Sequence, residues 1–203
     1  MNGKERVKTA LLHKEADRVP IFEAAFSSAL GSEIMRREIY IPSNGGSSQR
    51  HFLQIRMTGN KNLTKAAQQS ARDAINLYAH LGIDMIRVRM TDFLTPVDFG
   101  YGNFGSKALF DSEIIEKGLN RWRIIAPEDF WSEHVYEPQT DSMMCINSTI
   151  NEGGIKALSR YIDFLENIPP GIPKGAEPGL QGVKEAVKCA DAKGIFVLGW
   201  GDV

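Results

Sequence analysis

A helix that stops at a glycine and leads straight into an apolar strand constrains this fold more than any other feature. The apolar spacing predicts a helix over 64–81, with Thr64 as its cap and Gly82 as its stop. A strand of mostly apolar residues follows at once over 83–90 and ends close to an acid, Asp92. A strand that follows a helix in this way is half of an α/β repeat, and in such folds the strand ends carry the chemistry. We therefore expect function at the carboxyl end of this strand, beginning with Asp92.

The other apolar patterns predict helices that alternate with a few strands. Asn2 and Glu5 have the spacing of a capping box at the first helix, and Thr149 and Glu152 repeat it later. Residues 137–147 follow no clear period. Helices are expected over 2–13, 30–40, 49–58, 149–166 and 180–193, with a short one starting at Pro127, and strands over 19–22, 122–125 and 195–198.

The position of the last predicted strand bears on domain organisation. The sequence ends at Val203, soon after that strand, although the loop after a strand is where an α/β protein builds its site. Eight β/α units also need roughly 200–250 residues, and only three or four strands are predicted here. We expect residues 1–203 to form a single domain that is a fragment of something larger.

Composition excludes several classes of partner. The formal net charge is −1 with 24% charged residues, so the chain lacks the basic footprint of a nucleic-acid-binding protein. The N-terminal residues are charged throughout, unlike a signal peptide, and no apolar run approaches the ~20 residues that cross a membrane. Cys145 and Cys189 are isolated, which predicts buried, reduced thiols. Together these features predict a cytoplasmic protein.

Three stretches, in this order, carry a family resemblance: KERVKTALLHKEADRVPIF (4–22), HLGIDMIRVRMTDFLTPVDFGYG (80–102) and GVKEAVKCADAKGIFVLGWGDV (182–203). They resemble the uroporphyrinogen decarboxylase superfamily, which includes the decarboxylases of haem biosynthesis and the cobamide-dependent methyltransferases. The resemblance implies a TIM-like (β/α) barrel with extra N-terminal helices, of which this chain is the incomplete N-terminal part. It also puts Asp92, within Met90-Thr91-Asp92-Phe93-Leu94, in the place of the catalytic aspartate of a Phe-Ser-Asp-Ile-Leu segment.

The arginines that hold substrate carboxylates in the decarboxylases have no counterpart at the matching positions. Those enzymes follow the first strand with Arg-Gln-Ala-Gly-Arg, whereas this sequence, laid ungapped from Pro20, has alanine at both arginine positions, Ala25 and Ala29. A substrate with many carboxylates needs guanidinium partners. Arg36 and Arg37 lie downstream, but their helix register favours a solvated face. The resemblance therefore favours the methyltransferase branch.

The methyltransferase branch implies a zinc site made by a His-x-Cys pair and a distant cysteine, which binds a thiol as its thiolate. In this sequence no histidine has a cysteine two residues later. We therefore predict no metal site in this chain, and zinc only if its ligands lie in a missing C-terminal half. A corrinoid of the cobalamin type would be the methyl carrier, whereas a decarboxylase would need no cofactor.

Four further residues are predicted to bind the substrate. Arg87 and Arg89 lie on the face of the central strand opposite its apolar residues, so they either bind an anionic ligand or pair with acids such as Asp84 and Glu23. Glu23 follows the first predicted strand and is expected near the mouth of the barrel. Trp200 follows the last strand between two glycines, where an indole can stack on a flat macrocycle.

These observations lead to three functional hypotheses. The first is methyl transfer between a corrinoid carrier and a thiol or pterin acceptor, with Asp92 holding a polar group of the ligand. The second is decarboxylation of uroporphyrinogen, a carboxy-lyase reaction of tetrapyrrole biosynthesis. The third is a non-catalytic half-barrel that binds a corrinoid protein or a partner chain, including a second copy in a homodimer. Whether this chain alone is an enzyme stays open at this point, and no nucleic-acid or membrane partner is expected.

Overall fold

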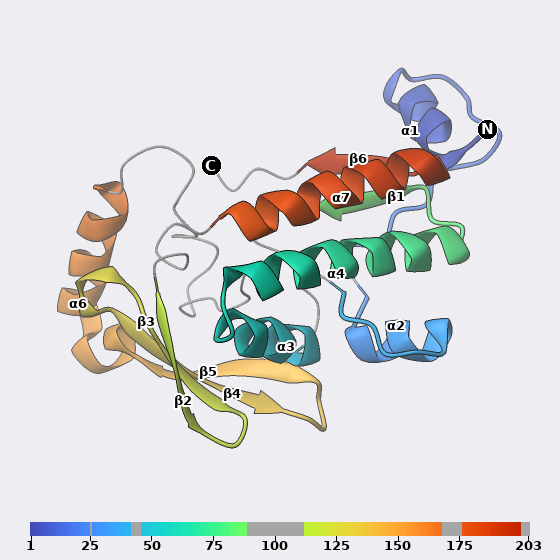
Figure 1. Ribbon diagram of the computed structural model, residues 1–203. Helices are drawn as coiled ribbons and strands as arrows, with labels where there is room; N and C mark the ends of the chain where they lie inside the picture. Colours follow the sequence, from blue (N-terminus) through green and yellow to red (C-terminus); the bar gives the residue numbers. More distant parts are fainter. Residues whose placement is uncertain (25, 42–45, 89–111, 168–175, 200–203) are drawn as a thin grey trace.

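Two separate β-sheets and six α-helices make up the described part of the chain, which covers residues 1–24, 26–41, 46–88, 112–167 and 176–199 of a computed structural model. A parallel pair of strands lies with helices on one side of the molecule, and a four-stranded antiparallel sheet lies on the other (Figure 1). The fold is mixed α/β, and its described strands form open sheets and no closed barrel.

The parallel pair consists of β1 (Met85–Val88) and β6 (Phe196–Gly199), with Met85 opposite Phe196. Phe22 forms an isolated parallel bridge to Met85, so β1 has a parallel neighbour on each side. The strand predicted over 19–22 is reduced to this bridge. The strands predicted over 83–90 and 195–198 are confirmed within the described residues, with shifted ends. Three segments that are distant in sequence therefore run side by side in one direction.

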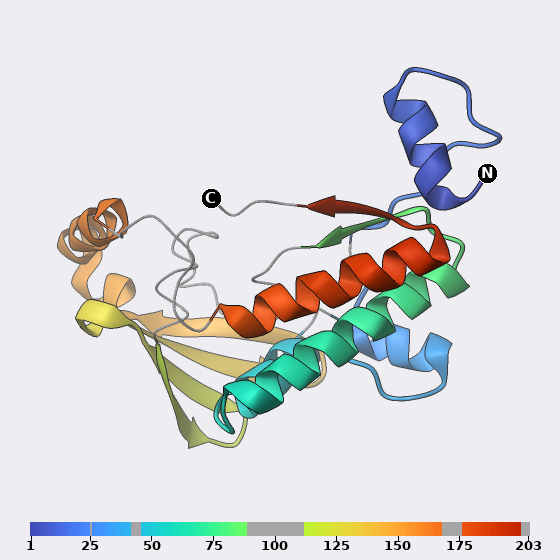
Figure 2. The same ribbon diagram turned by 45° about the horizontal axis from the view of Figure 1, so that its top comes forward.

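Helices α4 (Asn60–His80) and α7 (Glu177–Lys193) cover one face of the parallel pair and lie against each other (Figure 2). Alanines line the contact between the two helices and let their backbones approach closely, while Ile86 and Val88 of β1 complete the same core. These small and branched residues are buried: Ala67, Ala71, Ala74, Ile75, Ala186 and Ala190.

Both helices follow the sequence prediction closely, with corrections at their starts. Helix α4 begins at Asn60 rather than at residue 64, so Thr64 lies inside the helix and Gly59 is at the N-cap. It ends as predicted, because Gly82 has a positive φ of 68° that a helix does not adopt. Gly194 ends α7 in the same left-handed conformation, with φ 65°.

Three shorter helices precede α4: α1 (Gly3–Leu11), α2 (Ser28–Met35) and α3 (Gly46–Arg56). The predicted capping box of Asn2 and Glu5 is confirmed, with both reciprocal hydrogen bonds present. Helix α2 is shorter than predicted because Arg36 adopts a left-handed conformation and ends it. Ser27 caps its start by accepting a hydrogen bond from the Leu30 N–H at 3.2 Å.

The second sheet is an antiparallel meander in the order β2-β3-β4-β5. Its strands are β2 (Glu113–Gly118), β3 (Arg121–Ile125), β4 (Trp131–Glu137) and β5 (Ser142–Ser148), with a 3₁₀ turn, η2 (Pro127–Asp129), between β3 and β4. The sequence predicts only the strand at 122–125 and the short helix at Pro127. One face of the sheet packs against α3, where Leu53, Trp122 and Ile124 are buried together.

Helix α6 (Thr149–Glu166) follows the sheet, and the structure corrects two expectations about it. Ser148, not Thr149, is the cap, and its hydroxyl accepts a hydrogen bond from the Asn151 N–H at 3.1 Å. The apolar spacing predicts that Ile155, Leu158, Ile162 and Leu165 face inward. Ile155 is 82% exposed and Ile162 45%, whereas Ile150 and Tyr161 are buried, and of the predicted residues Leu165 packs partly against them. Gly154 has non-helical φ and ψ of 59° and −144°, so the first turn of α6, which carries Ile150, is set off from the rest of the helix.

None of the helices within the described ranges combines the length and the apolar character that a bilayer crossing requires.

We predict that the stability of the antiparallel sheet depends on pH through His134 of β4. His134 is 2% exposed, and burial lowers its pKa to about 4, while Nε2 lies 2.8 Å from the Ser132 hydroxyl. The unfolded chain takes up a proton on this ring below a pH of about 6.5, and the folded chain does not until about pH 4. The free energy of unfolding should therefore fall in this window, by about 3 kcal/mol in total.

Urea unfolding at about pH 7, 5.5 and 4.5 measures this effect, with His134→Gln as the variant and His80→Gln as the control. His80 is an exposed residue of α4, so H80Q should keep the wild-type pH dependence. H134Q should be less stable than wild type at neutral pH and lose less stability on acidification. An equal pH dependence in H134Q and wild type would contradict the assignment.

Candidate functional site

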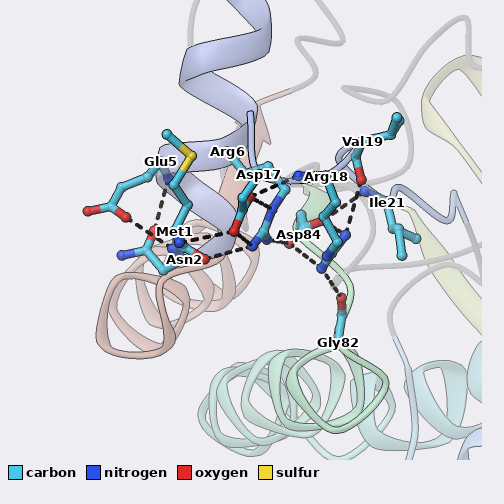
Figure 3. Close-up of polar contacts among 10 residues, drawn as sticks. All are labelled: Met1, Asn2, Glu5, Arg6, Asp17, Arg18, Val19, Ile21, Gly82 and Asp84. Carbon is cyan, nitrogen blue, oxygen red and sulfur yellow. Dashed lines mark hydrogen bonds and ion pairs between the residues drawn. The ribbon is translucent and has the colours of Figure 1, made fainter. Parts of the chain in front are cut away.

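A buried carboxylate fixes the start of β1. Asp84 is 2% exposed, and its oxygens accept hydrogen bonds from Arg6 Nη1 at 2.5 Å, Arg18 Nη1 at 2.6 Å and the Ile21 N–H at 2.8 Å (Figure 3). Arg6 comes from α1, and Arg18 and Ile21 come from the segment that leads to the Phe22 bridge. One carboxylate therefore joins three parts of the N-terminal region to the central parallel strand.

A second acid completes this network. Arg6 is itself buried and donates from Nε and Nη2 to the two oxygens of Asp17, at 2.6 and 2.9 Å. Two guanidinium groups thus face two carboxylates, which satisfies the charges that burial would otherwise penalise. Burial raises the pKa of Asp84, but the hydrogen bonds from Ile21, Arg18 and Arg6 outweigh it, so this pKa lies below its ordinary value.

The network bears on one of the two alternatives for the arginines of the central strand, that they pair with acids such as Asp84. Residues 84, 86 and 88 alternate onto one face of the strand, and Arg87 points to the other. The described partners of Asp84 come instead from the amino end of the parallel pair. With its acids ionised and paired, the network holds strands in place and offers no proton donor or acceptor for catalysis.

The carboxyl ends of the parallel strands lie on the opposite side of the molecule. The arrowheads of β1 and β6 point away from α1 and toward the region of the four-stranded sheet (Figure 1). Arg87 is half-buried on the β1 face opposite the helices, as predicted. Glu23 is exposed one residue after the Phe22 bridge, and its backbone carbonyl accepts a hydrogen bond from the Tyr78 hydroxyl at 3.0 Å. The structure therefore places Arg87 and Glu23 on neighbouring parallel segments.

Three predicted site residues, Asp92, Arg89 and Trp200, lie outside the described residues. Their assignments as ligand-binding or catalytic groups stay predictions, as do those of Arg87 and Glu23.

The arginines after α2 take the structural role that the sequence favours. Arg36 and Arg37 are both exposed, and Arg37 pairs with the buried carboxylate of Asp73 on α4. The hydrogen bond to Asp73 raises the pKa of Arg37, which remains a cation held at the surface. Neither arginine lines the polar cavity between α2 and α3 described next.

Sequence analysis missed a polar cavity of about 390 Å³ between α2, α3 and the β4–β5 hairpin. Its lining includes Ser28, Glu38, Tyr40, Arg50, His51 and Asp141. The signal for it was present in α3, where Ser47, Arg50, His51 and Gln54 recur at helical spacing on the face opposite Phe52 and Leu53. From sequence alone, such a polar stripe indicates a helix face exposed to solvent. Only the position of the β4–β5 hairpin in the fold shows that this face forms one wall of a cavity.

At neutral pH the polar cavity contains one cationic side chain, Arg50, and the uncharged rings of His51 and Tyr40. Burial lowers the pKa of His51, which is therefore neutral at pH 7, and its ring stacks on Tyr40 with centroids 3.6 Å apart. Burial, followed by the hydrogen bond to Glu38, raises the pKa of Tyr40 to about 12. The Arg50 guanidinium is the positive group of the lining.

The described residues hold no cluster of three or more histidine, cysteine or acidic side chains that would ligate a metal. Zinc chemistry therefore has no support from this part of the chain. Cys145 and Cys189 are free and only partly buried, rather than fully buried as predicted. Burial raises the pKa of Cys189, so this thiol is protonated at neutral pH and does not behave as a reactive thiolate.

Comparison with protein-family models, curated proteins and solved structures finds no significant match to this chain.

We predict that Asp84→Asn destabilises the fold severely. The change removes one of the two carboxylate charges that compensate Arg6, a buried cation, and the one that pairs with Arg18, and removing one partner of a buried ion pair costs about 3–5 kcal/mol. For a domain of this size that corresponds to a fall in melting temperature of roughly 6–20 °C. Thermal unfolding at neutral pH, followed by circular dichroism, measures it.

Asp191→Asn is the matched control, because Asp191 pairs with Lys4 at the surface with its side chain 58% exposed. Exposed pairs contribute about 0–1 kcal/mol, so this variant should melt close to wild type. Equal melting temperatures for D84N and D191N would show that the network does not hold β1.

Proposed function

We propose that this chain is the N-terminal part of a (β/α) barrel of the uroporphyrinogen decarboxylase type, and that it acts in methyl transfer between a corrinoid carrier and a thiol or pterin acceptor. The observation that carries the proposal is the arrangement of β1, which has a parallel neighbour on each side and, among the described elements, helices packed on one face. A (β/α) barrel has this construction, with helices outside, side chains inside and the site at the carboxyl ends of the strands.

The two faces of β1 match the two environments of a barrel strand. Ile86 and Val88 pack against α4 and α7, which is the environment of the outer face. Met85 and Arg87 point the other way and are half-buried, which is what an incompletely enclosed interior would leave. A guanidinium on the inner face is suited to an anionic group of the ligand, because it is always charged and forks toward two oxygens.

The proposed reaction moves a methyl group with no net redox change. A bound corrinoid would supply the methyl group as a cation equivalent, and the acceptor sulfur or nitrogen would supply the lone pair for the new bond, so no external oxidant or reductant is needed. A thiol acceptor also loses its proton. In this proposal Asp92, which follows β1, holds a polar group of the ligand, and Arg87 binds an anionic one. No step is assigned to zinc, because the described residues offer it no ligands.

We prefer methyl transfer to decarboxylation because this sequence lacks the two arginines that hold substrate carboxylates in the decarboxylases. The pattern of the decarboxylases requires cations after the first strand, and this sequence has Ala25 and Ala29 there. Of the two arginines downstream, Arg36 is exposed and Arg37 is paired with Asp73. A ligand with many carboxylates would therefore find few of the guanidinium partners that it needs.

The test is a titration of the chain with methylcobalamin, followed by the visible spectrum of the corrinoid. We expect saturable binding that Asp92→Ala and Arg87→Met each weaken about tenfold, the effect of losing one hydrogen bond to a charged group. Asp191→Ala is the control, since Asp191 is an exposed residue near the end of α7, and it should bind as wild type does.

A parallel titration with uroporphyrin separates the reactions. Binding of uroporphyrin but not of methylcobalamin would replace methyl transfer with decarboxylation. Binding of neither would overturn both enzymatic hypotheses, and binding of methylcobalamin that is equally strong in D92A and R87M would remove these residues from the site.

A further inference from the structure

The polar cavity between α2, α3 and the β4–β5 hairpin has features of a binding site in its own right. Its described lining includes no residue of β1 or β6, so it is distinct from the strand ends of the proposed function. One wall is the polar stripe of α3, another is the hairpin with Tyr136 and Asp141, and the third comes from α2 and residues 38–40. A volume of about 390 Å³ falls at the lower end of the range for small-molecule sites.

Arg50 is the side chain in this cavity whose bonding is incomplete. Its Nε is buried and has no hydrogen-bond partner among the described residues. Its guanidinium carbon lies 5.4 Å from the centroid of the Tyr136 ring, a cation–π contact that orients the group without using its N–H donors. A buried donor without an acceptor is costly. The Nε is closed to solvent, so an acceptor in the cavity would meet the outer N–H donors of the same guanidinium, which is part of the lining.

The two carboxylates of the lining, Asp141 and Glu38, do not act as acceptors for Arg50 Nε, because they accept hydrogen bonds from other groups. Asp141 accepts hydrogen bonds from the Ser47 N–H at 2.6 Å, from the Ser47 hydroxyl at 3.2 Å and from the Tyr136 hydroxyl at 3.2 Å. Glu38 accepts one from the Tyr40 hydroxyl at 2.7 Å. Both acids brace the walls of the cavity, and the cation faces the space between them.

The rings beside Arg50 provide a flat, neutral wall. His51 and Tyr40 stack with an interplanar angle of 5°, and both line the cavity. His51 is neutral at pH 7, so it adds no second positive charge but offers ring nitrogens for a hydrogen bond. A ligand here meets one guanidinium, a flat aromatic surface, hydroxyl groups and two carboxylates that already accept hydrogen bonds from the walls.

From this geometry we infer that the cavity binds a small organic oxyanion, whose two coplanar oxygens are held by the Arg50 guanidinium. Carboxylates and phosphate esters share this chemistry, and a planar guanidinium fits either in a forked arrangement. Gln54 lies one turn after Arg50 on the same face of α3 and provides an amide for a second polar group of the ligand.

The experiment titrates the chain with succinate, with inorganic phosphate and with succinamide, the neutral analogue of succinate. Ring-proton NMR signals of His51 report binding inside the cavity, and those of His80, an exposed residue at the end of α4 that is not part of the lining, report any global change. We expect succinate or phosphate to shift the His51 signals in a saturable manner and succinamide to leave them unchanged. Whichever anion binds more tightly identifies the source of the oxyanion as a carboxylate or a phosphate.

Arg50→Gln should weaken anion binding about tenfold or more, the effect of losing a charged hydrogen-bond donor. Lys184→Gln removes the same charge from an exposed position of α7 and should leave binding unchanged. Gln54→Glu is the second variant: it places an acid one turn from Arg50 at an exposed position, so it should weaken binding with Arg50 intact, even if R50Q fails to fold.

Three results would overturn the inference. One is the absence of His51 shifts with both anions, and another is equal binding of succinamide and succinate. The third is unchanged anion affinity in Q54E and in a folded R50Q. None of these results bears on methylcobalamin binding, so the two proposals fail or stand separately.

Discussion

The arrangement of the parallel strands depends on one buried carboxylate. Asp84 lies at the start of β1 and is held by two arginines and a backbone N–H from the N-terminal region. An ion pair of this kind adds little net stability compared with apolar packing, because desolvation offsets the attraction. Its effect is on specificity: any arrangement that leaves Asp84 without its arginines buries an unpaired charge, so the chain adopts the one in which α1 and the Phe22 segment meet β1.

Close backbone approach reinforces this arrangement. A Cβ on Gly3 would lie 2.8 Å from the Cα of Asp84, and one on Gly194 would lie 2.8 Å from the Cβ of Asn2. The Lys4 N–H also donates to the Gly194 carbonyl at 2.6 Å. Helix α1 is therefore seated against the amino ends of both parallel strands, which leaves their carboxyl ends as the side available to a ligand.

Sequence reasoning succeeded where a single period governs a long segment. Helices α4 and α7 have apolar residues on one face and a glycine stop, and both were predicted to within a few residues at their carboxyl ends. The antiparallel sheet was largely missed because β2 is mostly exposed and its polar residues give no alternation to detect. In α6 the apolar spacing was misleading, since Ile155 and Ile162 are exposed while Tyr161, outside the predicted stripe, is buried against Phe130.

In the candidate sites, too, features set by a local sequence pattern were predicted, and features made by residues distant in sequence were missed. Arg87 was placed correctly on the strand face opposite the helices, because alternation along a strand fixes that face whatever the tertiary context. The partners of Asp84 were not predictable, since they come from residues about 65 to 80 positions earlier that only the fold brings near. The cavity at Arg50 was missed for the same reason: its opposite wall, at Tyr136 and Asp141, is formed by a distant hairpin.

The connection between β1 and β6 has a consequence for synthesis on the ribosome. Met85 pairs with Phe196, so the whole antiparallel sheet, α6 and α7 emerge before the strand that completes the parallel pair. At ~5–20 residues per second, β1 waits several seconds with one edge unpaired. During that interval the nascent chain exposes a hydrogen-bonding edge beside apolar residues, which makes this the stage at which a chaperone or a slower codon would most affect the yield of folded protein.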